Sequence, residues 1–175
     1  MRVGTNGVEP LRETLVRFAP GCGLAVLAEI AEEWREEVLA AFRALGESGI
    51  GGRRSWGAGH FELAVEPWEV REPATPTAYC TLSFYVPAAR ELEQGVLGPP
   101  ARYWLTERSG WVGQPGGGTL RHRSLRAIGP GSVLAPVAGR PPVGRLADVT
   151  PAGFRDHEVL RAGWAFPVGV REMVP

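Results

Sequence analysis

Residues 49–59 read Gly49-Ile50-Gly51-Gly52-Arg53-Arg54-Ser55-Trp56-Gly57-Ala58-Gly59 and decide how the rest of the chain is interpreted. Five glycines and two adjacent arginines occupy these eleven residues. Glycine loses the most backbone entropy on folding, so such a cluster indicates left-handed backbone or a close approach to a ligand. Arginine beside bare backbone N–H groups is suited to phosphate. The alternative interpretation is a purely structural connector.

The residues before this stretch predict a helix, and those after it predict a strand. From Ile30 to Leu45 apolar residues recur at helical spacing among charged ones, and Gly46 is the expected C-cap. After the loop, Phe61, Leu63 and Val65 alternate with mostly polar residues, which is typical of a half-buried strand. The glycine stretch is therefore expected to connect a helix to a strand.

Further elements are expected along the chain. The remaining strands are expected at residues 11–18, 23–28, 77–86 and 102–107, and a short helix at residues 88–93. From residue 23 on, the order is strand, helix, strand, strand, helix, strand. This is the order of the ferredoxin-like (RRM-like) fold, an antiparallel sheet with two helices on one face. We therefore predict an α+β protein of that type.

A turn-rich, β-rich extension is expected over residues 109–175. It would include a ribbon with arms at residues 111–112 and 119–128 around residues 115–118, and short strands at residues 132–134, 146–149 and 164–168. Residues 1–20 are expected to be an irregular lead-in. The whole chain, residues 1–175, is predicted to be a single domain.

Composition excludes several classes of protein. The chain has 175 residues, 44% apolar and 22% charged, with 24 glycines, 16 prolines and a formal net charge of zero. All 19 basic residues are arginine, which suits planar, bidentate contacts better than lysine does. Cys22 and Cys80 are too few for a disulfide framework and are expected in the core, as are Trp34, Trp104 and Trp164. Neither a signal peptide nor a membrane span is visible, so we expect a cytoplasmic protein.

Known catalytic and nucleotide-binding motifs do not fit. A P-loop needs a lysine after the glycines and a strand before them, and the dinucleotide fingerprint needs a third glycine where Arg54 stands. His60, His122 and His157 are not at metal-ligand spacing, and no G-x-S-x-G motif surrounds Ser55. We therefore predict neither a metal nor a cofactor.

A second basic strip follows the predicted ribbon turn. Residues 121–126 contain Arg121, His122, Arg123 and Arg126, with Tyr103, Trp104 and Trp111 nearby in sequence. Arginines interleaved with aromatic residues suit single-stranded RNA, whose phosphates contact cations and whose bases stack. The alternative for this strip is a solvated strand face.

The glycine stretch, continued through His60 and Phe61, resembles the G-x-G-G-x-R-S-x-G-x-G-x-F signature of the RAMP superfamily of CRISPR-associated proteins. Within it, the chain is similar to the fourth subunit of the type III-A (Csm) effector complex. Four other stretches resemble the same family: residues 78–87 (AYCTLSFYVP), 107–112 (ERSGWV), 123–134 ending in GPGSVL, and 159–166 (VLRAGWAF). Members have two ferredoxin-like halves, and this chain resembles the second. The first half is expected on a separate polypeptide or absent from this one.

The resemblance implies a non-catalytic subunit. It would grip the 5′ repeat-derived end of the CRISPR RNA and contact the large polymerase-like subunit and the backbone RAMP subunits. The RNA-binding residues it implies are Gly49, Gly51, Gly52, Arg53, Arg54, Ser55, Gly57 and Gly59, and we add Arg121 and Arg123 from the basic strip.

Two other functions are consistent with the same residues. One is a metal-independent CRISPR-RNA-processing endoribonuclease of this superfamily, for which His60 is the candidate acid–base group. The other is a protein-interaction domain without RNA contact, in which the glycine stretch is a subunit-docking turn.

Overall fold

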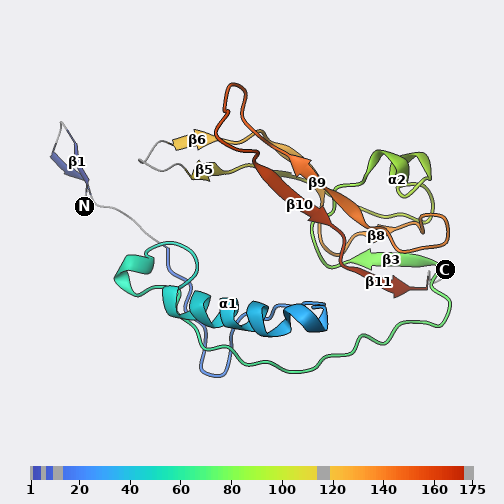
Figure 1. Cartoon of the computed structure of the whole chain (residues 1–175), viewed down its shortest axis with the longest axis horizontal. Coiled ribbons are helices and arrows are strands. Elements are labelled where there is room, and N and C mark those ends of the chain that lie inside the picture. Colours follow the sequence, from blue (N-terminus) through green and yellow to red (C-terminus); the bar gives the residue numbers. More distant parts are fainter. Residues whose placement is uncertain (1, 5–6, 10–13, 114–118, 172–175) are drawn as a thin grey trace. The chain divides into compact units, whose positions relative to one another are not determined.

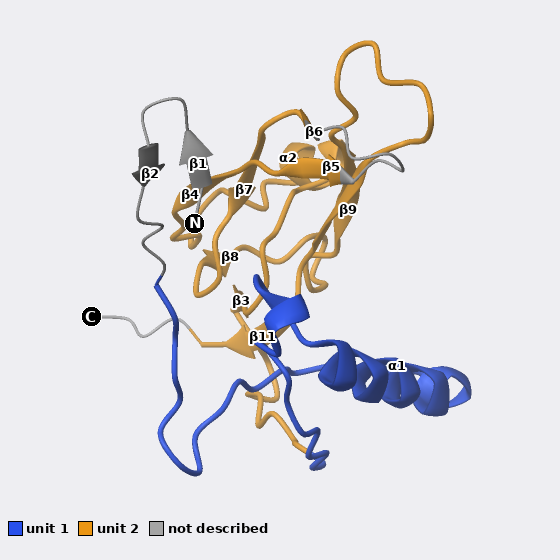
Figure 2. Ribbon diagram, turned by 90° about the vertical axis from the view of Figure 1, so that its left-hand side faces the viewer, with its two compact units in different colours: residues 1–67 blue, residues 68–175 orange. Residues whose placement is uncertain are grey.

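The structure, a computed structural model, describes residues 2–4, 7–9, 14–113 and 119–171. The chain divides into two compact units, residues 1–67 and residues 68–175 (Figure 2). Helices and several small antiparallel sheets make up the described residues, which confirms the α+β class. The ferredoxin-like arrangement is not confirmed. The single domain predicted over residues 1–175, with its lead-in and its β extension, stays a prediction.

The unit of residues 1–67 contains one long helix. A 3-10 turn, η1 (Glu32–Trp34), leads into α1 (Arg35–Ser48), as the apolar periodicity predicts (Figure 1). The helix passes through Gly46 and ends at Ser48, three residues later than predicted, with Gly49 as its C-cap. The other elements of this unit are a hairpin and a second 3-10 turn: β1 (Arg2–Gly4), β2 (Gly7–Glu9) and η2 (Arg54–Trp56).

Two predicted strands of this unit are not formed. Among the described residues, 23–28 and 61–65 have no strand pairing, and neither do residues 14–18 of the predicted first strand. Residues 11–13 of that strand lie outside the described part. Alternating apolar residues indicate which side chains share a face, but a strand also needs a paired neighbour for its backbone groups. Leu24 and Val26 are about two-thirds exposed. Cys22 is exposed as well, so its predicted place in the core is wrong.

The unit of residues 68–175 contains short strands in small sheets. The three-stranded sheet has β3 in the centre, between β11 and β8, and the other pairs are β4–β7, β5–β6 and β9–β10 (Figure 1). The elements are β3 (Ala78–Thr81), α2 (Ala89–Glu93), β4 (Leu105–Arg108), β5 (Trp111–Gly113), β6 (Thr119–Arg121), β7 (Leu125–Ile128), β8 (Val133–Leu134), β9 (Gly144–Asp148), β10 (Leu160–Trp164) and β11 (Pro167–Val170).

The sequence placed most of these strands but gave several of them the wrong extent. The strand predicted at residues 164–168 spans the end of β10 and the start of β11, and residues 165–166 belong to neither. The strand predicted at residues 77–86 forms β3 only as far as Thr81, and Tyr85 then pairs separately with Ile128. The predicted ribbon exists, but its second arm divides into β6 and β7, which pair with different strands. The division lies where the backbone N–H of Arg123 donates to the carbonyl of Val149, 2.8 Å away. The predicted turn at residues 115–118 lies outside the described residues.

The core of this unit consists of two small apolar clusters. Tyr85, Val96, Ile128 and Leu134 form one, and Val86, Ala127 and Ala147 form the other. Trp104 and Trp164, like Trp34 in the other unit, are more than half exposed, so their predicted place in the core is wrong. Cys80 is half-buried, as a side chain at the edge of this core. The core is therefore built from Tyr85 and smaller apolar residues, and the tryptophans lie on the surface.

A buried carboxylate joins α2 to a distant loop. Glu91, 7% exposed, accepts hydrogen bonds from the backbone N–H groups of Ala88 (2.8 Å), Val143 (2.7 Å) and Gly144 (3.1 Å). Burial opposes its ionisation, but these N–H groups outweigh that effect and hold the pKa of Glu91 below its ordinary value. Burial, and then the charge of the neighbouring Glu91 carboxylate, raise the pKa of Tyr85, whose hydroxyl is buried.

The carboxylate of Glu91 makes a testable contribution to stability. A carboxyl group whose pKa is lowered by folding stabilises the protein above its ordinary pKa, and the contribution is lost as the pH falls through the lowered, folded value. We expect Glu91→Gln to lower the free energy of unfolding at pH 7 by about 2 kcal/mol, because charge-assisted hydrogen bonds are lost. The difference from the unchanged protein should shrink as the pH falls below about 4.3. Urea unfolding at several pH values measures both effects.

Glu93→Gln is the matched control, because Glu93 lies on the same helix and is exposed. This substitution should change the unfolding free energy by less than about 0.5 kcal/mol. Equal effects of the two substitutions would contradict the role given to Glu91.

Candidate functional site

The glycine stretch forms a closed loop at the end of α1. The N–H of Gly49 donates to the carbonyl of Leu45 (2.8 Å) and ends the helix. One residue later, the N–H of Ile50 donates to the carbonyl of Gly59 (2.9 Å), so the two ends of the loop meet. The N–H of Phe61 then donates to the carbonyl of Gly46 (3.3 Å). These bonds fix the base of a loop that extends from residue 50 to residue 59.

Two glycines are required where the loop closes. Gly49 (φ 79°) and Gly59 (φ 80°) have backbone angles that side chains rarely adopt. A Cβ at Gly49 would lie 2.7 Å from the carbonyl oxygen of Ala58, and one at Gly59 would overlap the backbone of Ile50. Gly51 and Gly57 also have positive φ but face open space, as does Gly52. The glycines thus divide into two that close the loop and three that keep its tip uncovered.

The two arginines have different environments in this loop. Arg53 adopts a left-handed backbone (φ 59°) at the start of η2, and its guanidinium lies 4.3 Å from the ring centre of Trp56. Arg54 and Ser55 are exposed. In the described structure the N–H groups of Gly51 and Gly52 donate to no other backbone group. The loop therefore presents N–H donors and guanidinium groups on one short exposed segment, which suits an anion.

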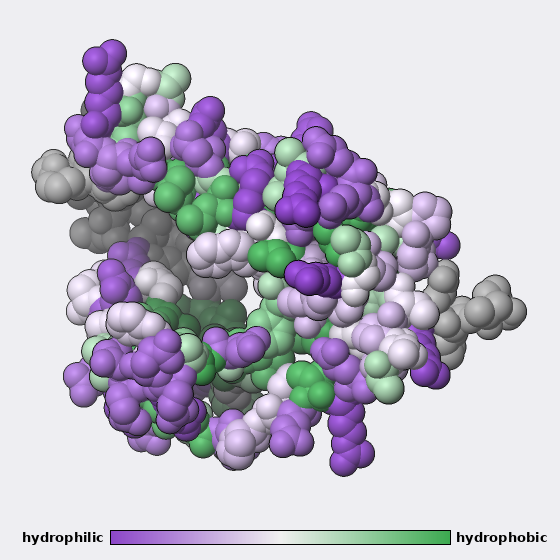
Figure 3. Space-filling model, turned by 45° about the vertical axis from the view of Figure 1, so that its right-hand side comes forward, coloured by the Kyte–Doolittle hydropathy of each residue, from purple (hydrophilic) through white to green (hydrophobic). Residues whose placement is uncertain are grey.

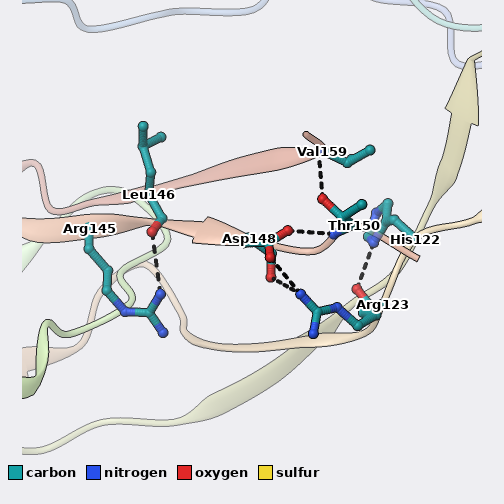
Figure 4. A network of polar contacts seen from close by, with 7 residues as sticks. All are labelled: His122, Arg123, Arg145, Leu146, Asp148, Thr150 and Val159. Atoms are coloured by element: carbon teal, nitrogen blue, oxygen red, sulfur yellow. Dashed lines mark hydrogen bonds and ion pairs between the residues drawn. The ribbon is translucent and has the colours of Figure 1, made fainter. Parts of the chain in front are cut away.

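The basic strip takes part in structural contacts that the sequence did not reveal. Arg123 forms an ion pair with Asp148 (2.8 Å) and also donates to the Asp148 carbonyl (3.1 Å). Thr150, through its side chain and its backbone N–H, and then Arg123 hold the pKa of Asp148 below its ordinary value. The N–H of Val159 donates to the Thr150 hydroxyl oxygen (2.9 Å), so this network links the end of β9 to the start of β10 (Figure 4). Arg123 is therefore part of the network that links β9 to β10.

His122 lies inside the protein, although the sequence groups it with a basic surface. It is 4% exposed, and its Nδ1 lies 2.7 Å from the carbonyl oxygen of Arg123 (Figure 4). A carbonyl only accepts, so Nδ1 carries the proton, and Nε2 then accepts from Arg161 at 3.1 Å. Gly110 makes room for this pair, because a Cβ there would lie 2.8 Å from Nε2. The histidine thus has a structural role.

Arg121 has a different neighbour from Arg123. Its guanidinium lies 4.7 Å from the ring centre of Trp111, its partner across the β5–β6 ribbon. Arg126 and Glu107 are likewise paired across β7 and β4. The three arginines of the strip therefore have three separate environments, and the sequence did not show this because it cannot give the cross-strand register.

His60 follows the loop directly. It is exposed beside an open groove at the end of α1, whose other lining residues are Arg43, Gly46, Glu47, Phe61, Glu62 and Leu63. The glycine loop and this groove belong to the unit of residues 1–67, and the basic strip belongs to the unit of residues 68–175. The two sets of predicted site residues therefore belong to different units.

Comparison with known proteins identifies the class. Residues 75–170 match a family of CRISPR-associated proteins. The matching model is that of the CRISPR Csm4 C-terminal domain, and because it covers more than half of the chain, the chain belongs to the Csm4 family. It is thus a subunit of the type III-A CRISPR effector class. The match includes the basic strip and begins after the glycine loop, which lies outside it. No curated protein matches the chain.

Two features are absent from the described residues, a membrane-spanning helix and a metal-binding cluster. None of their helices is long and apolar enough to cross a membrane. In the same residues, no group of three or more histidine, cysteine, aspartate or glutamate side chains is arranged to hold a metal ion.

Closure of the glycine loop can be tested directly. We expect Gly59→Ala to open the loop base, because a positive φ costs a residue with a Cβ about 1–2 kcal/mol and the new Cβ would overlap Ile50. Hydrogen exchange at the Ile50 amide should become roughly tenfold faster or more. Gly52→Ala is the matched control, since Gly52 faces open space without a positive φ. Equal exchange rates in the two variants would contradict the closure.

Proposed function

We propose that this chain is a non-catalytic RNA-binding subunit of a type III-A CRISPR effector complex. In this proposal it grips the 5′ repeat-derived end of the guide RNA. It also contacts the large polymerase-like subunit and the backbone RAMP subunits. Membership of the Csm4 family supports the complex, and the resemblance of residues 49–61 to the RAMP signature supports the RNA.

The geometry of the glycine loop is the single observation that carries the RNA proposal. The loop base is closed between Ile50 and Gly59, while its tip exposes Gly51, Gly52 and Arg54. A closed base holds the tip in one conformation before the ligand arrives, which reduces the entropy cost of binding. N–H donors next to a guanidinium group can bind one or two phosphates. The net charge of zero is no obstacle, because this contact is local.

The proposal that the subunit is not an enzyme rests on the resemblance of residues 49–61 to the signature of a non-catalytic subunit, and His60 is the candidate acid–base group of the alternative. Cleavage of RNA without a metal needs acid–base groups arranged around one phosphate. The groove beside His60 is lined by Arg43, Glu47 and Glu62 and is open to solvent. Incubation with labelled repeat RNA in the presence of a chelator tests this point. Cleavage that is abolished by His60→Ala would establish the endoribonuclease instead.

The proposal that other subunits dock on this chain is supported by exposed apolar residues in the unit of residues 68–175. Figure 3 shows apolar side chains at the surface of the molecule. Alternation along the β9–β10 ribbon puts Ala147 and Gly163 on the buried face. The opposite face carries Leu146, Leu160 and Trp164, all exposed. An apolar strip of this kind is typical of a protein interface. The interaction-domain alternative would use the same strip without RNA.

The ferredoxin-like arrangement also belongs to the proposal. The order of the segments is that of the fold, and residues 23–28 and 61–65 keep the apolar pattern of strands without a paired neighbour. Pairing with a neighbouring subunit would give their backbone groups hydrogen-bond partners.

The two loop arginines provide the test of RNA binding. We expect the double substitution Arg53→Ala with Arg54→Ala to weaken the association with single-stranded repeat RNA. The slope of log K against log salt should become less steep by roughly 1.4, because each phosphate contact to single-stranded RNA contributes about 0.7. Fluorescence anisotropy over a series of salt concentrations measures both quantities.

The matched control is the double substitution Arg90→Ala with Arg155→Ala, which removes two exposed arginines that lie outside both predicted RNA sites. It should leave the slope unchanged. A slope that is the same for the loop variant and for the unchanged protein would count against phosphate binding by the loop.

A further inference from the structure

An exposed tryptophan on the β5–β6 ribbon is held against an arginine. Trp111 on β5 and Arg121 on β6 are directly opposite each other in the antiparallel register. The guanidinium lies 4.7 Å from the ring centre of Trp111, a cation–π contact. Trp111 nevertheless remains 60% exposed. The arginine thus orients the indole ring and leaves much of it open to solvent.

Strand alternation fixes the direction of this pair. The next residue on β5, Val112, and the residue after Arg121, His122, are both buried. Successive side chains of a strand point to opposite faces, so the burial of Val112 and His122 places Trp111 and Arg121 on the outer face. His122 is held there by the Arg123 carbonyl and by Arg161. The fold therefore places the large aromatic side chain of Trp111 on the surface.

Exposure alone does not distinguish Trp111, because other tryptophans are exposed too. Trp104, however, packs on Gly129 and donates its indole N–H to the carbonyl of Pro130 (3.1 Å), so it has a structural role. Trp164 lies on the apolar outer face of β9–β10 with Leu146 and Leu160. Trp111 instead is paired with a cation. The same pairing occurs between Trp56 and Arg53 in the glycine loop, 4.3 Å apart.

We propose that the Trp111–Arg121 pair is a stacking platform for one unpaired base of single-stranded RNA. The base stacks on the open part of the indole, while Arg121 holds the ring and attracts the neighbouring phosphate. Stacking is tolerant of sequence because every base has a π face. The inference rests on the proposed function and adds to it a contact to a base, made by Trp111, outside the glycine loop.

The test compares two RNAs and three variants of the full chain. The probes are a single-stranded RNA of the repeat-derived 5′ sequence and the same RNA with abasic sites throughout, which keeps every phosphate. We expect Trp111→Leu to weaken binding of the intact RNA about tenfold, as the loss of one base stack does. Its salt slope should be unchanged, because phosphate contacts are kept. Binding of the abasic RNA should be the same for Trp111→Leu and for the unchanged protein.

Two variants serve as controls. Trp111→Phe keeps an aromatic face and should restore most of the affinity for the intact RNA. Trp68→Leu removes another tryptophan of the same unit that is also 60% exposed, and it should leave the affinity unchanged.

The outcomes separate this inference from the proposed function. Equal affinity of the unchanged protein and of Trp111→Leu for the intact RNA overturns the stacking platform. An equal loss of affinity for the abasic RNA, or an equal loss in the Trp68→Leu variant, overturns it as well. In each of these cases RNA binding itself survives. Failure of the unchanged protein to bind either RNA overturns the proposed function and the stacking platform together.

Discussion

The buried carboxylate of Glu91 is the contact on which the unit of residues 68–175 depends. Its helix, α2, has five residues and would not be stable alone. The strands around it have two to five residues each, so neither helix nor strands are long enough to hold the unit by backbone ladders only. Glu91 binds the first turn of its own helix and the N–H groups of Val143 and Gly144 at the start of β9. It therefore connects parts of the chain that are about fifty residues apart, at one charged and fully satisfied site.

Backbone conformation is the corresponding constraint at the glycine loop. The unit of residues 1–67 has little buried side-chain surface in its described part, where Gly46 and Gly49 are the buried residues. The shape of the loop is set instead by positive φ angles and by the hydrogen bond between Ile50 and Gly59. A site built in this way is rigid at its base and accessible at its tip. These two properties are what a phosphate-binding loop requires.

Sequence reasoning predicted the elements better than their partners. Periodicity and turn residues predict the long helix before the glycine loop, the short helix after Pro87 and the ribbon at residues 111–121. The sequence could not show that the strands expected at residues 23–28 and 61–65 are not formed, because alternation does not reveal whether a neighbouring strand is present. The same limit applies to the site. The composition of residues 49–59 indicated the glycine loop. The ion pair between Arg123 and Asp148 and the burial of His122 depend instead on the register of the paired strands, which the sequence does not give. The role of Glu91 was missed because a single glutamate on a short helix carries no pattern.

The claim that the glycine loop grips the guide RNA is tested most directly by photocrosslinking within the assembled complex. The chain would be purified with its co-expressed neighbouring subunits and their RNA, irradiated and digested, and the crosslinked peptides and nucleotides identified by mass spectrometry. We predict that peptides containing residues 49–59 carry nucleotides from the 5′ repeat-derived end of the RNA. Crosslinks that avoid these residues, or that join them to the opposite end of the RNA, would contradict the account.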